Sequence, residues 1–286
     1  MKIAIIGAGI SGLTCAYELV RKGITPVIFE MKGFVGHQLE YSSIWQMKNK
    51  FTKIDSVKYL KNNFDLEITP MEKLRTIEFF LGDKKKRIDG DLGYIMRRGR
   101  ESHSIEKQLA SKLNVRIELD SYIKIEEIKD LFDIIVVATG NNLIAKQYNL
   151  WTDLNVSQVR VATVLGNFDT GSIKVWFNRD YAQNALFYLV PNNPLEASLV
   201  MKVKGVYHHE LYYYWDTFLS KECVSYNITE VRDGELCFGA VKSQVKEQIY
   251  FIGNAGGLAD KFIGAGDFNA ILSGLHAAKS IMEKKS

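Results

Sequence analysis

The sequence predicts an α/β protein that combines a Rossmann-like nucleotide-binding domain with an inserted, mostly β domain. Residues 1–30 contain a complete β-α-β unit around a glycine-rich turn, and residues 248–282 contain an apolar strand, a glycine-rich segment and a helix. Between them, residues 150–247 are rich in strand-like segments. Strands that alternate with helices indicate a parallel sheet, whereas successive strands indicate a separate β unit.

The N-terminal unit has the order strand, turn, helix, strand. An apolar, β-branched run from Lys2 to Ile6 is typical of a buried parallel strand, and residues 7–12 fit G-x-G-x-x-G. Apolar residues then recur at helical spacing until Gly23, and Val27–Phe29 forms a second strand. In this context the motif predicts dinucleotide binding rather than a simple glycine-rich turn. The residues expected around the phosphates are Gly7, Ala8, Gly9, Ile10, Ser11 and Gly12.

Each part of this unit has a physical role. Gly7 permits the tight turn, Gly9 lets a pyrophosphate approach the backbone, and Gly12 lets helix and strand pack closely. The start of the helix offers N–H groups and partial positive charge to the phosphates. Glu30 would accept hydrogen bonds from a ribose and repel a 2′-phosphate, which predicts FAD or NAD rather than NADP. The expected nucleotide contacts extend to Met31.

Composition favours an ordinary globular protein without a metal or nucleic-acid site. The 286 residues are 47% hydrophobic and 24% charged, with a net charge of +4. The densest basic run, Lys84–Arg87, is flanked by aspartates and indicates a solvated hairpin turn. Cys15, Cys223 and Cys237 have neither zinc-site nor C-x-x-C spacing, which suggests a reducing, cytoplasmic setting. The motif at residue 7 leaves no room for a signal peptide, and no apolar run could span a membrane, although peripheral membrane contact stays open.

Two further segments extend the nucleotide-binding signal. Residues 132–140 form an apolar strand that ends in Ala138, Thr139 and Gly140, whose small side chains let the chain pass close under a dinucleotide. After the apolar strand 248–252 come Gly253, Asn254 and further glycines, then a helix expected at about 267–282.

The strand pair 76–81 and 87–89 around Gly82 does not follow the β-α-β rhythm and indicates insertion. Residues 1–45, 91–148 and 248–286 are therefore assigned to the nucleotide-binding domain, and 46–90 and 149–247 to the β domain.

Together these blocks resemble the FAD-dependent oxidoreductases of the geranylgeranyl reductase type, which have the p-hydroxybenzoate hydroxylase-like fold. The resemblance lies in Gly7–Glu30, Asp133–Gly140, Gly253–Ala278, and more faintly in Gly93–Arg98 and Leu186–Pro191. It implies an extended FAD as the cofactor.

The resemblance also implies roles for individual residues. Arg98 would lie along the cofactor, and Gly253 and Asn254 beside its ribityl chain, with Asn254 standing where the family usually has aspartate. The turn Gly264-Ala265-Gly266 would aim a helix start at the pyrimidine edge of the flavin. The Asp-Gly motif of many hydroxylases is absent after Gly140, and there is no second G-x-G-x-x-G. An external electron donor, either NAD(P)H or a redox protein, would therefore bind transiently.

The resulting hypothesis is an FAD-dependent oxidoreductase that transfers hydride at flavin N5 to or from an apolar or aromatic small molecule. Reduction of an isoprenoid-like double bond is the reaction that the resemblance favours. The candidates for substrate contact are His37, Tyr188 and the segment Tyr212–Trp215, although His37 fits a polar loop without chemistry at least as well. Two alternatives stay open: a flavin-dependent monooxygenase of an aromatic compound, and a non-redox dinucleotide-binding module.

Overall fold

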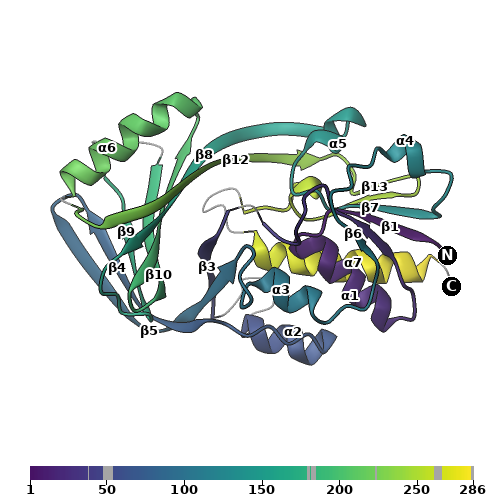
Figure 1. Cartoon of the computed structure of the whole chain (residues 1–286), viewed down its shortest axis with the longest axis horizontal. Coiled ribbons are helices and arrows are strands. Elements are labelled where there is room, and N and C mark those ends of the chain that lie inside the picture. The colour runs from purple at the N-terminus through teal and green to yellow at the C-terminus, as the bar shows by residue number, and fades with distance from the viewer. Residues whose placement is uncertain are drawn as a thin grey trace.

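The computed structural model describes residues 1–37, 39–47, 54–178, 181, 185–222, 224–260 and 266–284. These residues form two halves, a nucleotide-binding-type α/β half and a half dominated by one large sheet (Figure 1). The two long strands β8 (Trp151–Leu165) and β12 (Asn227–Val241) run from the large sheet toward the first half. The predicted combination of a Rossmann-like domain with a β-rich part is confirmed.

The first half is built on a mostly parallel sheet with the strand order β13-β14-β7-β1-β2-β6. Its strands are β1 (Ile3–Ile6), β2 (Val27–Phe29), β6 (Ile117–Glu118), β7 (Ile134–Val137), β13 (Val245–Lys246) and β14 (Ile249–Phe251). Because β7 and β14 pair in parallel with this sheet, both later segments return to the N-terminal unit as the sequence predicts. The helix after the first strand, α1 (Ile10–Arg21), and the last helix, α7 (Asp267–Glu283), also lie where they are expected.

Helices cover both faces of this sheet because the central strands β1 and β7 are apolar on both sides. One face packs against α1, α7 and α3 (Ile105–Ala110), and the other against α4 (Ile125–Ile128) and α5 (Leu143–Gln147). The Ser104 hydroxyl caps α3 by accepting a hydrogen bond from the Lys107 N–H at 3.3 Å. The starts of α1 and α7 lie near each other, beyond the carboxyl ends of β1 and β14.

Helices α1 and α7 approach closely at Gly274. A Cβ atom at this position would lie 2.4 Å from the Ser11 carbonyl oxygen and 2.8 Å from the Cys15 nitrogen. We expect Gly274→Ala to lower the free energy of unfolding by about 1–3 kcal/mol, because the backbone overlap outweighs the better helix propensity of alanine. Urea unfolding checks this, with the half-buried Ser280→Ala on the same helix as the control. Equal stability of the Gly274 variant and the wild type would contradict the close packing.

The second half is an eight-stranded sheet with the order β12-β8-β11-β10-β9-β4-β5-β3. Besides β8 and β12 it contains β3 (Tyr41–Gln46), β4 (Glu72–Leu81), β5 (Lys84–Arg98), β9 (Ser172–Trp176), β10 (Ala185–Asn193) and β11 (Glu196–Lys204). The predicted hairpin around Gly82 is confirmed by the pairing of Leu81 with Lys84. Neighbouring strands are antiparallel except β4 and β9, which run parallel.

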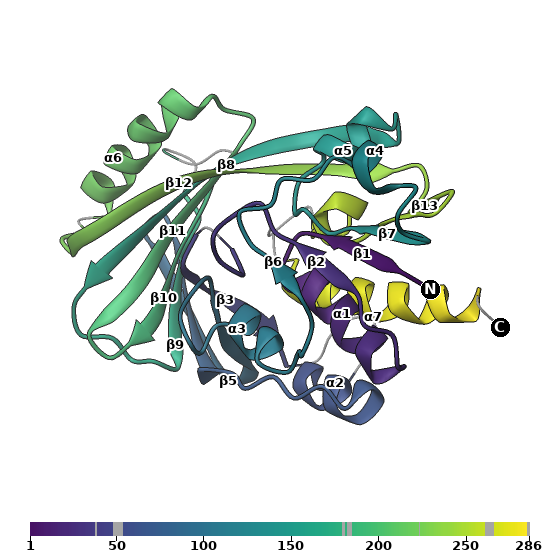
Figure 2. The ribbon, with the colours of Figure 1, turned by 45° about the vertical axis from the view of Figure 1, so that its right-hand side comes forward.

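Successive side chains on this sheet point to opposite faces. On the outer face, Phe187 packs with Trp215 and Phe218 of α6 (Leu211–Lys221), which follows the short 3-10 helix His208–Glu210. The inner face carries a second apolar cluster that includes Tyr188 and Leu39. Figure 2 shows α6 on the side of the sheet away from the nucleotide-binding half. The inner face is therefore the one that meets the nucleotide-binding half.

The predicted domain division differs from the observed structure in the placement of β3, β5 and α2. Strand β3 and all of β5 belong to the large sheet, because β5 continues as one strand across residue 91 and pairs with β3 before residue 46. Helix α2 (Ser56–Phe64), assigned to the β domain, packs against α1 instead: the Tyr17 hydroxyl donates to the Asp65 carbonyl at 2.7 Å. Helix α6 interrupts the otherwise β-rich part. Among the described residues, no helix has the length and apolarity required to cross a membrane.

Candidate functional site

The glycine-rich turn forms an open cradle at the start of α1. Gly7 has φ of +108°, and a Cβ atom there would lie 2.5 Å from the Ala138 carbonyl oxygen. A Cβ atom on Gly12 would lie 2.1 Å from the Gly7 carbonyl oxygen, whereas one on Gly9 would meet no atom within 4 Å. No side chain caps α1 at Gly9. Two glycines therefore hold the turn together, and the third faces open space in front of helix N–H groups that suit an anion.

The Glu30 carboxylate is buried and fixed beside this turn. One carboxylate oxygen accepts a hydrogen bond from the Ala8 N–H at 2.7 Å, and the other accepts from the Lys32 N–H at 3.0 Å. The side chain is 8% exposed. A carboxylate has about four acceptor positions, so each oxygen keeps capacity for a ribose hydroxyl. Glu30 directly follows β2, and its contact with a ribose stays a prediction.

A cavity of about 1090 Å³ extends from the glycine turn to the inner face of the large sheet. It contains most of the predicted nucleotide contacts: Gly7, Gly9, Ile10, Ser11, Glu30, Met31, Arg98, Ala138, Thr139, Gly140, Asn254 and Gly266 line it, and so does His37. Ala8, Gly12 and Gly253 are not among the lining residues, and Gly264 and Ala265 fall outside the described residues.

Three groups of lining residues carry no sequence motif. They are Ser121–Glu126 before and within α4, residues of 143–148 in and after α5, and the group Tyr41, Leu236 and Asp267 at the far end. The chain brings them to the cavity only by tertiary packing.

Arg98 forms a buried charge cluster at the far end of the cavity. Its Nε donates to a Glu106 carboxylate oxygen at 2.9 Å, and one terminal nitrogen donates both to the Tyr41 hydroxyl at 3.3 Å and to the Asp267 carboxylate. Burial lowers the pKa of the guanidinium, but the carboxylates of Asp267 and Glu106 outweigh it and raise the pKa above its ordinary value. Asp267 is the first residue of α7, so this cluster joins the large sheet to the nucleotide-binding half.

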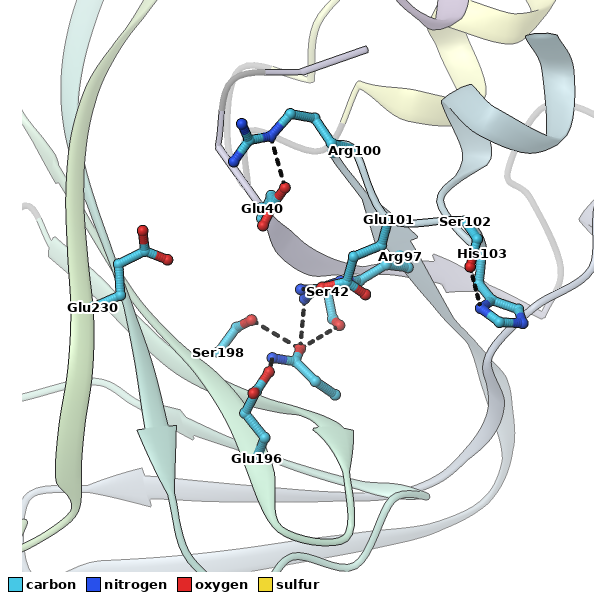
Figure 3. A network of polar contacts seen from close by, with 12 residues as sticks. Glu40, Ser42, Arg97, Arg100, Glu101, Ser102, His103, Glu196, Ser198 and Glu230 are labelled. Atoms are coloured by element: carbon cyan, nitrogen blue, oxygen red, sulfur yellow. Dashed lines mark hydrogen bonds and ion pairs between the residues drawn. The ribbon is translucent and has the colours of Figure 1, made fainter. Parts of the chain in front are cut away.

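A polar network fixes the strand that presents Arg98. The Asn192 side-chain oxygen accepts hydrogen bonds from Ser42 at 2.8 Å, from Arg97 at 2.9 Å and from Ser198 at 2.9 Å (Figure 3). These residues come from β10, β3, β5 and β11. Because neighbouring residues of a strand point to opposite faces, Arg97 binds this network while Arg98 points to the cavity.

His37 lies on the cavity wall close to Arg98. Its Nδ1 lies 3.1 Å from the Leu39 nitrogen and 3.3 Å from the Leu39 carbonyl oxygen, and its ring meets Tyr41 edge-to-face at 5.9 Å. Burial, helped by the positive charge of Arg98, lowers the pKa of His37 to about 4. The imidazole is therefore neutral at pH 7 and does not serve there as a charged acid.

The lowered pKa of His37 predicts a pH-dependent stability. The unfolded chain takes up a proton near pH 6.5, whereas the folded protein takes it up only near pH 4. The stability that this difference contributes is complete above pH 6.5 and is lost as the pH falls toward 4, by up to about 1.4 kcal/mol per pH unit. Urea unfolding between pH 7.5 and 4.5 should show a shallower loss in His37→Gln than in the wild type, with the exposed His103→Gln as control. Identical profiles for wild type and His37→Gln would argue against a neutral His37.

The other two candidates for substrate contact do not line the cavity. Tyr188 lies on the inner face of the sheet in the apolar cluster with Leu39 and Tyr41, and burial raises the pKa of its hydroxyl above the ordinary value. Tyr212 and Trp215 belong to α6 on the outer face, where the Arg160 guanidinium stacks over the Tyr212 ring at 4.2 Å. The aromatic segment is thus part of the outer packing layer, because its helical spacing turns Trp215 toward that sheet face.

Comparisons with known proteins agree with this architecture. Residues 5–51 match the family model described as an NAD(P)-binding Rossmann-like domain. A geranylgeranyl bacteriochlorophyll reductase-like protein from Thermoplasma acidophilum aligns over 99% of this chain and 79% of its own, with a TM-score of 0.76 and 14% identity. The structure of CtdE in complex with FAD and a substrate aligns over 98% and 80%, with a TM-score of 0.72 and 13% identity.

A third structure is that of 2-methyl-3-hydroxypyridine-5-carboxylic acid oxygenase, which aligns over 99% and 82% with a TM-score of 0.69 and 14% identity. No curated protein sequence matches the chain. The chain therefore has the two-part fold of these proteins, as its sequence predicts.

Proposed function

We propose that the protein is an FAD-dependent oxidoreductase that acts on an apolar or aromatic small molecule. One observation carries this proposal: a single cavity joins the open glycine cradle and Glu30 at one end to the Arg98 cluster and the start of α7 at the other. An extended dinucleotide has the shape that such a cavity accommodates. Its adenosine half would bind near Glu30, and its flavin half near Arg98 and Asp267.

The residues present fit this cofactor. A methyl group on Gly9 would project into the space in front of α1, so glycine there keeps that space open for a pyrophosphate. Asn254 and Gly266 lie along the path between the two ends, and Ala138 and Gly140 offer a wall without large side chains. When bound, FAD supplies hydride transfer at N5.

The chain's own residues would bind the cofactor and exclude water from it. Glu30 holds a ribose, and the N-terminus of α1 offers its N–H groups to phosphate oxygens. At the far end, Tyr41 and Leu236 of the large sheet close the cavity with apolar surface, and the neutral His37 ring lies on its wall. The described cysteines Cys15 and Cys237 are free thiols, in keeping with a reducing, cytoplasmic setting.

Reduction of an isoprenoid-like double bond is the finer reaction that we propose. The apolar character of the inner sheet face, where Val161 and Val200 pack with Leu236, supports an apolar substrate. The similarity to a reductase-like protein supports the direction of the reaction. The electron donor would be NAD(P)H or a redox protein. A flavin monooxygenase of an aromatic compound is the second candidate, because the chain shares its fold with an oxygenase as well.

Anaerobic reoxidation of the reduced protein tests this function and separates the candidates. The FAD-loaded protein is reduced with dithionite and mixed with isoprenoid alkenes in the absence of oxygen, and flavin absorbance is followed. Reoxidation coupled to stoichiometric saturation of the alkene is the expected result. Reoxidation only in air, with hydroxylation of an aromatic compound, would establish the monooxygenase instead. A flavin that responds to no substrate in either condition would support the non-redox module.

A further inference from the structure

The buried charge cluster at the far end of the cavity carries more negative than positive charge. Arg98 is the single cation of the buried cluster, and it is paired with two carboxylates, Asp267 and Glu106. Both carboxylates are buried: Glu106 is fully covered, and Asp267 is 8% exposed. Of the two, only Asp267 lines the cavity.

The position of Asp267 is the unusual feature. It occupies the first turn of α7, where the helix dipole favours an anion and where a bound anionic group would meet helix N–H groups. The Asp267 carboxylate is itself stabilised by the helix dipole, and its negative charge repels a second anion at the same place.

Further titratable and charged groups lie near Asp267 and His37 in the part of the chain that the structure describes. They are Tyr41 on β3, Tyr188 on β10, His37 and Lys32 on the loop after β2, with Arg98 on β5 and Glu106 on α3. Burial raises the pKa of Tyr41 to about 12 and that of Tyr188 above its ordinary value, so both are neutral at pH 7. His37 is neutral above pH 4. Lys32 is half-buried and lines the same cavity.

We propose that Asp267 lowers the reduction potential of the bound flavin and keeps its reduced form neutral, which poises the site for hydride donation to a poorly activated double bond. This inference rests on the proposed FAD site. Two electrons and one proton would place negative charge at N1 and the C2 carbonyl of the flavin, whereas a second proton at N1 gives a neutral product. A fixed carboxylate nearby disfavours the first product and favours uptake of the second proton. A reduced flavin of low potential is the stronger hydride donor, so the charge balance favours the reductase over the monooxygenase.

The test is the reduction potential of the FAD-loaded protein, measured anaerobically against reference dyes between pH 6 and 8. Asp267→Asn removes the charge on the cavity wall at nearly constant shape. We expect its equilibrium constant for two-electron reduction to rise at least tenfold, a shift of about 30 mV. Glu106→Gln is the matched control, because it weakens the same arginine cluster at a residue that does not line the cavity. Its potential should change less, while its melting temperature should fall as much as that of the Asp267 variant.

The wild type alone provides a second readout that does not depend on the folding of a variant. Reduction of the wild type by two electrons should be accompanied by the uptake of two protons. This ratio should persist to a higher pH in the protein than in free FAD under the same conditions. Two results would overturn this inference while FAD binding stands. One is an equal reduction potential for the wild type and Asp267→Asn. The other is uptake of only one proton by the wild type at the pH where free FAD takes up only one. Failure of the wild type to bind FAD would overturn the proposed function and the inference together.

Discussion

Gly9→Ala should fold with the stability of the wild type and bind FAD about 10–100-fold more weakly. The single methyl group would enter the space in front of α1, where nothing lies within 4 Å, and would displace the pyrophosphate from the helix N–H groups. Hydrogen bonds to charged groups contribute about 1.5–3 kcal/mol each, and the loss of one or two weakens binding by the stated factor. Fluorescence titration of the apoprotein with FAD and urea unfolding measure the two properties.

Gly12→Ala is the control, and for this variant we expect a loss of stability. Its Cβ atom would lie 2.1 Å from the Gly7 carbonyl oxygen and 3.2 Å from the Ala138 side chain, so the strand and helix must separate. The free energy of unfolding should fall by about 1–3 kcal/mol or more. Equal FAD affinity in Gly9→Ala and wild type would contradict the assignment of the cradle to a pyrophosphate, whatever the stability of Gly12→Ala.

Arg98→Met should lower the free energy of unfolding by about 3–5 kcal/mol at pH 7, because it leaves two buried carboxylates without their cation. Glu106 and Asp267 belong to the nucleotide-binding half, whereas Arg98 belongs to the large sheet, and methionine replaces the arginine stem but provides no charge. Urea unfolding at pH 7 measures this effect.

Arg100→Met provides the comparison for this variant. Its guanidinium pairs with Glu40 at 2.9 Å, but the side chain is 41% exposed. Exposed pairs contribute at most about 1 kcal/mol, so this variant should remain near the wild type. Similar stabilities of the Arg98 and Arg100 variants would show that the buried cluster does not join the two halves.

The sequence was most informative where local geometry demands a particular residue type. Glycine at 7, 9 and 12, the apolar strand before them and Glu30 after them form a site from contiguous residues, so their spacing predicts their arrangement. The start of α7 follows from the glycine-rich segment before it in the same way. These positions supply the part of the cavity wall around the starts of α1 and α7.

Residues placed by tertiary packing could not be found from the sequence. Asp267 and Arg98 are 169 positions apart, and only the folded sheet brings them together. Helix α2 joins α1 through Leu60 and Phe64, although its neighbours in sequence belong to the large sheet. The segment Tyr212–Trp215 suggested a pocket by its aromatic composition, but helical periodicity turns it to the outer layer. The inner and outer faces of a sheet cannot be told apart from alternation alone.

The central claim is that one FAD molecule occupies the cavity between the glycine cradle and the large sheet. The most direct measurement is the visible absorption spectrum of the purified protein before and after addition of FAD and removal of the excess, followed by dithionite. Retention of one FAD per chain, with peaks that bleach on reduction and with much weaker retention in Gly9→Ala, is the predicted result. A wild-type protein that retains no flavin would contradict the account and would make NAD the next ligand to test.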